Sequence, residues 1–410
     1  MGLPGKLFKG DRVIWVIYVT LCLISLIEVF SATSTLVYKH GDYLKPVAEH
    51  FSHLLIGLAM ILVVHHIPYR FSSSLILLFL LPISILLLAV TLFFGLEINE
   101  SSRWINLFGI RFQPSELAKL SCVVYVSFLL SRRNEFTEAQ IFNAILIGVI
   151  VVCSLIFSEN FSTCAILFFF CYLMMFIGRI SLKRMGGLSL VVIALAVLFF
   201  SLLHTFPDDM VNKSGILAKI KHRTENVFKK KPPLDAKTYK IDDYNRQETY
   251  AKIAIANGGG VGKLPGHGQQ RDTLPQAYSD FIYAIIIEEL GVVAGIVVLL
   301  LYVVLLIRVG VIARKCNKLF PKLLVLGCGL LIGIQALTNM GVVVGLFPVT
   351  GQPLPLVSRG GTSIAITCIY FGIILNISHS GAGMGNEEEE EEEEEEKAAE
   401  EEEIKIETDL

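Results

Sequence analysis

Long uninterrupted apolar runs constrain this chain more than any other feature of its sequence. Of its 410 residues, 53% are hydrophobic, and the mean hydropathy is +0.63. A membrane-spanning helix needs a run of about 20 apolar residues, and the sequence holds about ten such runs. They cover residues 13–33, 47–66, 74–95, 113–131, 141–157, 161–178, 187–204, 281–307, 323–345 and 362–376.

The composition of these runs favours helices. Leu, Ile, Phe and Ala follow one another without the alternation of barrel strands, and a bilayer requires every backbone polar group to be satisfied internally. We therefore predict an all-α integral membrane protein, a polytopic bundle of about ten transmembrane helices with a large extracytoplasmic loop between helices 7 and 8. The expected parts are an N-terminus at 1–12, a membrane domain at 13–378 that includes the loop 205–279, and a tail at 379–410.

The formal net charge of −2 conceals two opposed parts. Residues 387–410 hold 16 acidic side chains and two lysines, so the rest of the chain holds 33 basic and 21 acidic residues. Short loops on one side carry most of these cations, which by the positive-inside rule predicts cytoplasmic termini and an outer loop 205–279. The run of ten glutamates at 387–396 cannot bury a core, so we predict a disordered tail, with binding of a basic partner as the alternative.

The eight cysteines show neither a disulfide framework nor a metal motif. Seven of them fall in the apolar runs and Cys316 falls in a short loop. We interpret them as small apolar packing groups.

A lone carboxylate, Asp280, stands where the large loop turns into the eighth run, in the stretch LPQAYSDFIYAIIIEELG at 274–291. Ionisable groups at membrane depth usually mark a site, so Asp280 is the first candidate for catalysis. The alternative is that Asp280 and Ser279 only cap the helix. Glu288 and Glu289 lie about 12 to 14 Å further along at 1.5 Å per residue, and we predict that they form a structural network.

The entrance to the fourth run carries five further candidates. Arg103 and Trp104 precede it, Gln113 stands at its start, and Glu116 and Lys119 are three residues apart on one helical face. In one interpretation Glu116 and Lys119 form a buried ion pair with each other or snorkel to the interface, and Trp104 is an interfacial anchor. In the other, Arg103 and Lys119 neutralise a diphosphate at the outer headgroup level.

Two further segments are rich in glycine or proline. The stretch 348–363 contains Ser358, Arg359 and Gly360, and it suggests a non-helical segment suited to a lipid headgroup, or else a tight connector. The glycine-dense stretch 256–270 allows a close backbone approach to a ligand, or it is a hinge.

Taken together, these stretches resemble the SEDS family of polytopic peptidoglycan glycosyltransferases, typified by RodA and FtsW. The resemblance covers nearly all of residues 11–378. The segments that carry it are SSRWINLFGIRFQPSELAKL at 101–120, IANGGGVGK at 255–263, LPQAYSDFIYAIIIEELG at 274–291 and GLFPVTGQPLPLVSRGGTS at 345–363.

The resemblance implies polymerisation of lipid II into glycan strands on the outer face of the bacterial cytoplasmic (inner) membrane. Asp280 corresponds to the family's essential outer-loop aspartate, and the candidates from Arg103 to Lys119 fall on its motif at the fourth helix. The implied partners are lipid II, undecaprenyl diphosphate-linked glycan, a class B penicillin-binding protein (transpeptidase) and other divisome membrane proteins, without nucleic acid. SATSTL after the first run resembles the division branch, FtsW, more than the elongation branch.

The chain departs from the family pattern at three places. Tyr278 and Ser279 stand where histidine and threonine are common, and Arg359 stands where tyrosine is common. The proline-aspartate signature between the fifth and sixth runs is replaced by residues 158–162, SENFS. Arg359 either adds a phosphate contact or pairs with a carboxylate of the loop.

The mechanism that we expect is an inverting transfer. Asp280 removes the proton of the acceptor hydroxyl as it attacks the donor's anomeric carbon, and undecaprenyl diphosphate leaves. The transfer is either metal-independent or assisted by a divalent cation (Mg²⁺ or Mn²⁺) held partly by substrate phosphates, and no other cofactor is indicated. The alternatives are a lipid II flippase, an elongation-type polymerase and a non-catalytic scaffold.

Overall fold

The computed structural model describes residues 9–32, 44–67, 75–98, 101–107, 110–205, 241 and 245–380. The lysine-rich part of the predicted outer loop and the glutamate-rich tail lie outside these residues. The last helix continues to Ser380, so the predicted boundary at 379 falls inside a helix.

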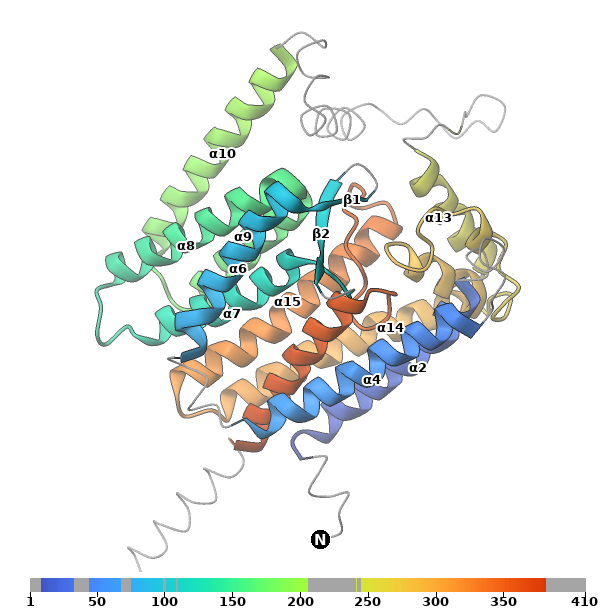
Figure 1. Cartoon of the computed structure of the whole chain (residues 1–410), viewed down its shortest axis with the longest axis horizontal. Helices are drawn as coiled ribbons and strands as arrows, with labels where there is room; N and C mark the ends of the chain where they lie inside the picture. Colours follow the sequence, from blue (N-terminus) through green and yellow to red (C-terminus); the bar gives the residue numbers. More distant parts are fainter. Residues whose placement is uncertain are drawn as a thin grey trace, which may run out of the picture.

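Every predicted apolar run coincides with a helix, and the polytopic helical fold is confirmed (Figure 1). α10 and α14 are the seventh and eighth of these helices. The helices are α2 (Arg12–Ala32), α4 (Leu44–His66), α6 (Leu75–Phe94), α7 (Pro114–Ser131), α8 (Glu138–Glu159), α9 (Phe161–Ile177), α10 (Leu182–Thr205), α14 (Ile282–Arg314), α15 (Leu319–Val343) and a C-terminal helix (Gly361–Ser380).

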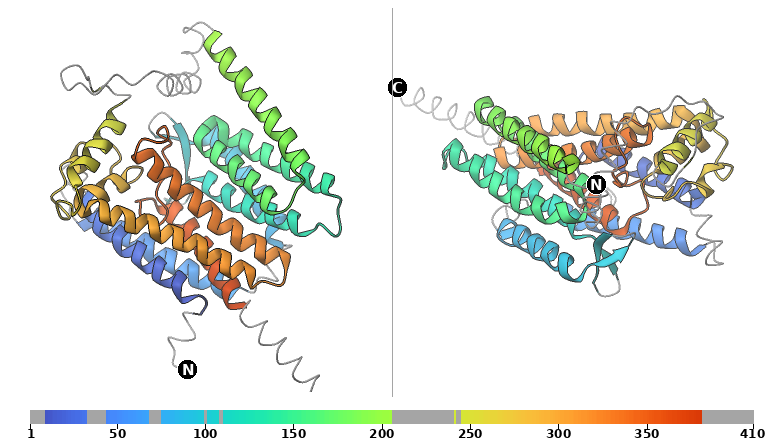
Figure 2. Two further views of the ribbon diagram at one scale, coloured as in Figure 1. Left: turned by 180° about the vertical axis from the view of Figure 1, so that it is seen from behind. Right: turned by 90° about the horizontal axis from the view of Figure 1, so that it is seen from above.

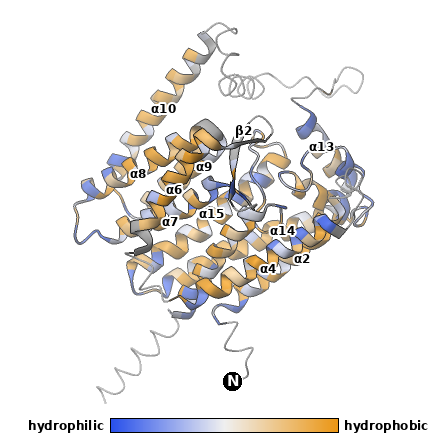
Figure 3. Ribbon diagram, viewed as in Figure 1, coloured by the Kyte–Doolittle hydropathy of each residue, from blue (hydrophilic) through white to orange (hydrophobic). Residues whose placement is uncertain are grey.

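Length and hydropathy identify the bundle as membrane-spanning. Among the described residues, seven helices are long and apolar enough to cross a bilayer, while α6 and α9 offer shorter apolar segments. α7 carries Glu116 and Lys119 in its first two turns. Apolar residues run through the middle of the bundle and polar residues gather at its ends (Figure 3). The chain is therefore a multi-pass membrane protein.

A small antiparallel sheet precedes α7, and the sequence analysis did not predict it. Its strands are β1 (Leu96–Ile98), β2 (Ser101–Leu107) and β3 (Ile110–Phe112), in the order β1-β2-β3. Trp104 pairs with Leu96 across β1 and β2. The Thr362 hydroxyl donates to the Arg111 carbonyl at 3.1 Å, which ties β3 to the C-terminal helix.

Both ends of the described chain lie at the same end of the bundle (Figure 1). The Asp11 N–H donates to Ser378 Oγ at 3.0 Å, and Arg308 Nε pairs with Asp11 at 2.6 Å. At the centre, α15 is the most buried of the candidate spans and contacts α14, α7 and α9. α10 diverges from the bundle in both figures of the fold (Figures 1 and 2).

The glycine-dense segment packs against the backbone of α14. This stretch, residues 256–270, begins in the last turn of α13 (Arg246–Gly258) and ends at the start of the 3-10 turn η1 (Gln270–Asp272). α14 bends at Gly291, where φ is 86° and ψ is 168°. Around this bend the N–H groups of Lys263 and Leu264 donate to the carbonyls of residues 288 and 289 at 3.0 and 2.8 Å. These glycines therefore serve a close approach between two stretches of this chain's own backbone.

We expect Gly258→Ala to destabilise the protein by about 1 to 3 kcal/mol, the usual range for overpacking. A Cβ at this position would lie 2.0 Å from the Ile287 carbonyl oxygen. Gly260→Ala is the matched control, because its Cβ would meet nothing within 4 Å. Thermal unfolding of both variants in detergent measures the difference. Equal melting temperatures would refute the packing described here.

Candidate functional site

Asp280 ends the turn that leads into α14. The helix has Phe281 at its N-cap position, and this residue makes no side-chain cap hydrogen bond. The Ser279 hydroxyl donates to the Gln276 side chain at 3.0 Å, so the capping role that the sequence allowed does not fall on Ser279. Asp280 itself is half-buried.

Three successive main-chain carbonyls, those of residues 278–280, accept hydrogen bonds from outside the turn. Their donors are, in order, the Arg359 N–H at 2.9 Å, the Ser358 hydroxyl, and Asn339 Nδ2 at 2.8 Å. We call this arrangement the carbonyl clamp. It fixes the backbone that carries Asp280 relative to α15 and to the segment before the C-terminal helix.

Two buried amides extend the carbonyl clamp inward. Asn339 and Gln352 are 1% and 4% exposed. Asn339 Nδ2 also donates to the Gln352 carbonyl at 2.8 Å, and Gln352 Nε2 donates to Thr163 Oγ1 on α9 at 2.8 Å. Neither amide was a predicted site residue. For Asn339 the available signal was an amide inside an apolar run, which has to find a partner.

Arg359 lies between α4 and the Asp280 turn. Its guanidinium pairs with Glu49 at 2.8 Å and lies 5.7 Å from the centre of the Tyr278 ring. The sequence left open a phosphate contact or an ion pair with a loop carboxylate. The structure shows an ion pair, with a carboxylate of α4 instead of the loop. Glu49 was missed, although it is an acidic residue at the outer end of an apolar run.

Two histidines of α4 complete this side of the site. His50 is buried and bonds Ser25 Oγ at 2.7 Å, and this hydroxyl donates to the Val357 carbonyl at 2.8 Å. His53 packs directly on Gly361, where an added Cβ would lie 2.7 Å from Nε2. Gly360, a predicted site residue, accepts from the Ile364 N–H at the start of the C-terminal helix. The structure thus brings Asp280, Ser358, Arg359 and Gly360 together.

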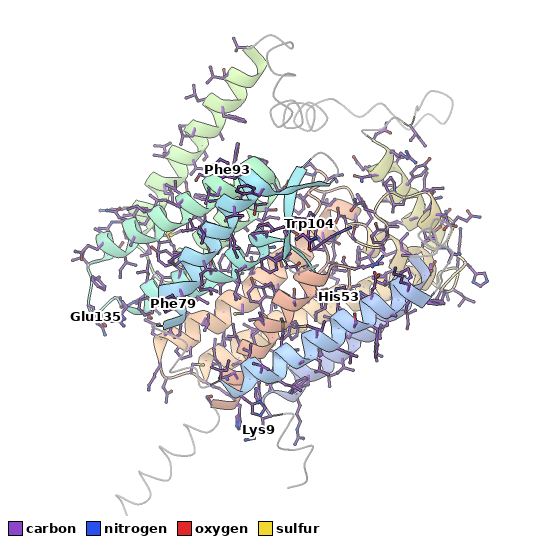
Figure 4. All side chains as sticks on the ribbon, in the orientation of Figure 1. Lys9, His53, Phe79, Phe93, Trp104 and Glu135 are labelled. Carbon is purple, nitrogen blue, oxygen red and sulfur yellow. The ribbon has the colours of Figure 1, made fainter. Side chains whose placement is uncertain are left out.

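The sheet and the start of α7 carry three further predicted site residues. Arg103 and Trp104 lie on β2, and Gln113 lies at the N-cap position of α7 with its amide donating to Ser115 Oγ at 3.1 Å. In the view of Figure 4, Trp104 and the α4 residue His53 are labelled near each other. The first residues of the C-terminal helix contact both β3 and His53, so they link the sheet to α4.

Glu116 and Lys119 form a buried ion pair. Lys119 Nζ lies 2.7 Å from Glu116 Oε1, and the two side chains are 0% and 4% exposed. This is the first of the two interpretations that the sequence allowed. To contact a diphosphate, Lys119 would have to leave Glu116.

Glu288 and Glu289 bind the glycine-dense segment. Both are fully buried, and they accept from four backbone N–H groups, those of Gly266, Gly268, Gln269 and Gln270, at 3.0 to 3.2 Å. The Ser31 hydroxyl of α2 donates to Glu289 at 2.6 Å. Lys263 and Arg271 lie 3.8 and 3.9 Å from Glu288 and Glu289. The two carboxylates therefore hold the loop that precedes Asp280 onto α14 and α2.

Within the described ranges, no group of three or more His, Cys, Asp or Glu side chains could hold a metal ion. A divalent cation would therefore need oxygen ligands from the substrate. Its participation stays a prediction.

We expect Lys119→Met to lower the stability by about 3 to 5 kcal/mol, because it leaves Glu116 buried without its cation. The double variant Glu116→Gln/Lys119→Met should recover most of this loss, since no buried charge then remains. Thermal unfolding in detergent measures both. An unchanged melting temperature for Lys119→Met, together with lost turnover, would show instead that Lys119 serves the substrate.

Comparisons with known proteins place the chain in a family. The model of the cell cycle protein family FTSW_RODA_SPOVE matches residues 11–382. A "Probable peptidoglycan glycosyltransferase FtsW" of Nitrosococcus halophilus (strain Nc4) is 33% identical over 339 residues, which cover 79% of this chain and 80% of the relative. One of the same name from Geobacter metallireducens is 29% identical, covering 90% of this chain and 95% of that one.

Solved structures share the fold. The rod shape determining protein RodA of Thermus thermophilus superposes with a TM-score of 0.64 at 22% identity, covering 90% of this chain and 96% of that one. A chain described under "Structural coordination of polymerization and crosslinking by a peptidoglycan synthase complex" gives a TM-score of 0.71 at 21% identity, covering 91% and 98%. With the family match over nearly the whole membrane domain, these likenesses show that the chain belongs to the FtsW, RodA and SpoVE family of cell cycle proteins.

Proposed function

We propose that this chain, an FtsW-like peptidoglycan glycosyltransferase, polymerises lipid II into glycan strands on the outer face of the cytoplasmic membrane, with Asp280 as general base. The observation that carries the proposal is the carbonyl clamp. It holds a half-buried carboxylate at the start of a membrane helix. A general base requires such fixed placement within hydrogen-bond reach of the proton it removes.

The proposed reaction forms one glycosidic bond and breaks one bond to phosphate. The acceptor hydroxyl attacks the anomeric carbon of the donor sugar, its proton passes to Asp280, and undecaprenyl diphosphate leaves with the bonding electrons. Because the leaving group is already good, one carboxylate suffices. A divalent cation, if it takes part, would be held partly by the substrate phosphates and would offset the charge that develops on the leaving diphosphate.

Arg359, beside the Asp280 turn, is suited to contact a diphosphate. Arg359 is 21% exposed, and its partner Glu49 is also open to solvent. Exchanging this exposed ion pair for a contact with phosphate therefore costs little free energy. Its planar guanidinium matches two phosphate oxygens. In the proposal Arg359 and Arg103 contact the diphosphate, with Lys119 joining them only if it leaves Glu116. Trp104 and Gln113 lie along the sugar.

The distribution of charge supports an orientation of the chain in the membrane, and the relatives support its proposed role and partner. Cations concentrate at the bundle end that holds both termini, which supports cytoplasmic termini and an outer Asp280. The relatives carry the name FtsW, which supports a role in division over elongation. The structural likeness to a peptidoglycan synthase complex that coordinates polymerisation and crosslinking supports a class B penicillin-binding protein as partner.

We expect Asp280→Asn to lower the polymerisation rate by about 10² to 10⁴, the usual contribution of a general base. The assay is formation of glycan ladders from labelled lipid II by purified protein in detergent. Without a bilayer no flipping can occur, so ladder formation also separates a polymerase from a flippase.

Asp272→Asn is the matched control. Asp272 is an exposed carboxylate of the same loop, and its replacement should leave the ladders unchanged. If Asp280→Asn forms glycan ladders at the normal rate, Asp280 is not the base. If no ladders form with the parent protein or with either variant, the chain is not a polymerase.

A further inference from the structure

The bundle end that holds both termini has a strongly basic surface. Among the described residues it carries twelve Lys and Arg side chains against three carboxylates, Asp11, Glu135 and Glu138. Each of these carboxylates is paired with an arginine. Most of the cationic charge at this end is therefore not neutralised by carboxylates of the described chain.

A cavity of about 210 Å³ opens within this surface, between the N-terminal end of α2, the end of α14 and the end of the C-terminal helix. Val311, Ile312 and Ile377 form its apolar wall, and Lys315, Arg308 and His379 supply basic groups. Lys315 and the neighbouring Lys9 are exposed. The hydrogen bond from the Asp11 N–H to Ser378 and the ion pair between Asp11 and Arg308 fix its shape.

We propose that this cavity and its rim of lysines bind the glutamate run at 387–396 of the same chain. The described part of the C-terminal helix extends to Ser380, and His379 lines the cavity, so the described chain stops at the cavity's edge. Six residues, 381–386, lie between Ser380 and Glu387, so seven residue steps lead from one to the other. At about 3.3 to 3.6 Å per residue they span up to about 25 Å, enough to reach Lys9 or Lys315.

Charge complementarity and tethering favour this occupant over a lipid headgroup. Residues 387–410 carry 16 acidic side chains and two lysines, while the rest of the chain carries 33 basic and 21 acidic residues. A tethered segment also acts at an effective concentration of the order of mM. An anionic inner leaflet repels the glutamates, whereas the basic surface formed by the described residues attracts them.

Zero-length cross-linking tests the proposal. Purified full-length protein in detergent is treated with a carbodiimide, which joins a carboxylate to a lysine only on contact, and the joined peptides are mapped by mass spectrometry. We expect links from 387–396 to Lys9 or Lys315 severalfold more often than to Lys183, an exposed lysine at the start of α10 on the same end of the bundle. They should vanish at about 1 M salt, where the Debye length is about 3 Å.

Three controls decide the outcome. Mixing heavy and light isotope-labelled protein should give links only within one chain, and Lys9→Gln/Lys315→Gln should remove them without a shift to Lys183. Links that persist in nanodiscs of anionic lipid support the tail as occupant. Links distributed evenly over all lysines, links only between chains, or links lost specifically when anionic lipid is present would overturn the proposal.

Discussion

The placement of Asp280 depends on hydrogen bonds that its own side chain does not make. Three successive carbonyls accept from Asn339 on α15 and from Ser358 and Arg359 before the C-terminal helix. A buried carbonyl left without its donor costs about 1 to 3 kcal/mol. The turn, α15 and the 352–359 segment therefore form one unit, and the backbone that carries Asp280 is held by elements of the bundle as well as by its loop.

The loop that precedes Asp280 is held by the reverse arrangement, in which side chains of the membrane helix bind loop backbone. Glu288 and Glu289 are fully buried, where an unpaired charge would be very unfavourable. Backbone N–H groups, with Lys263 and Arg271 nearby, supply the compensation. The bend at Gly291 admits the loop to this position. Both sides of Asp280 are thus anchored to membrane helices.

The fold was largely predictable because run length and hydropathy alone decide which segments span a bilayer. Helix boundaries were harder to predict from the sequence. α14 continues to Arg314, seven residues past the predicted end at 307, because helical hydrogen bonds continue after the apolar run stops. The short sheet at 96–112 gave no comparable signal. In the site, the Glu116–Lys119 contact was foreseeable because the partners are three residues apart. The Arg359–Glu49 pair joins residues 310 positions apart, and no local pattern indicates it.

The most direct test of this account is the steady-state kinetics of lipid II polymerisation by Asn339→Ala. This variant removes the donor to the Asp280 main-chain carbonyl and leaves the Asp280 side chain, the proposed diphosphate contacts and the sheet unchanged. The account predicts that kcat falls while KM for lipid II and the protein's assembly in detergent are retained, because the base is displaced and the substrate contacts are not. An unchanged kcat in a protein that still melts cooperatively would contradict it.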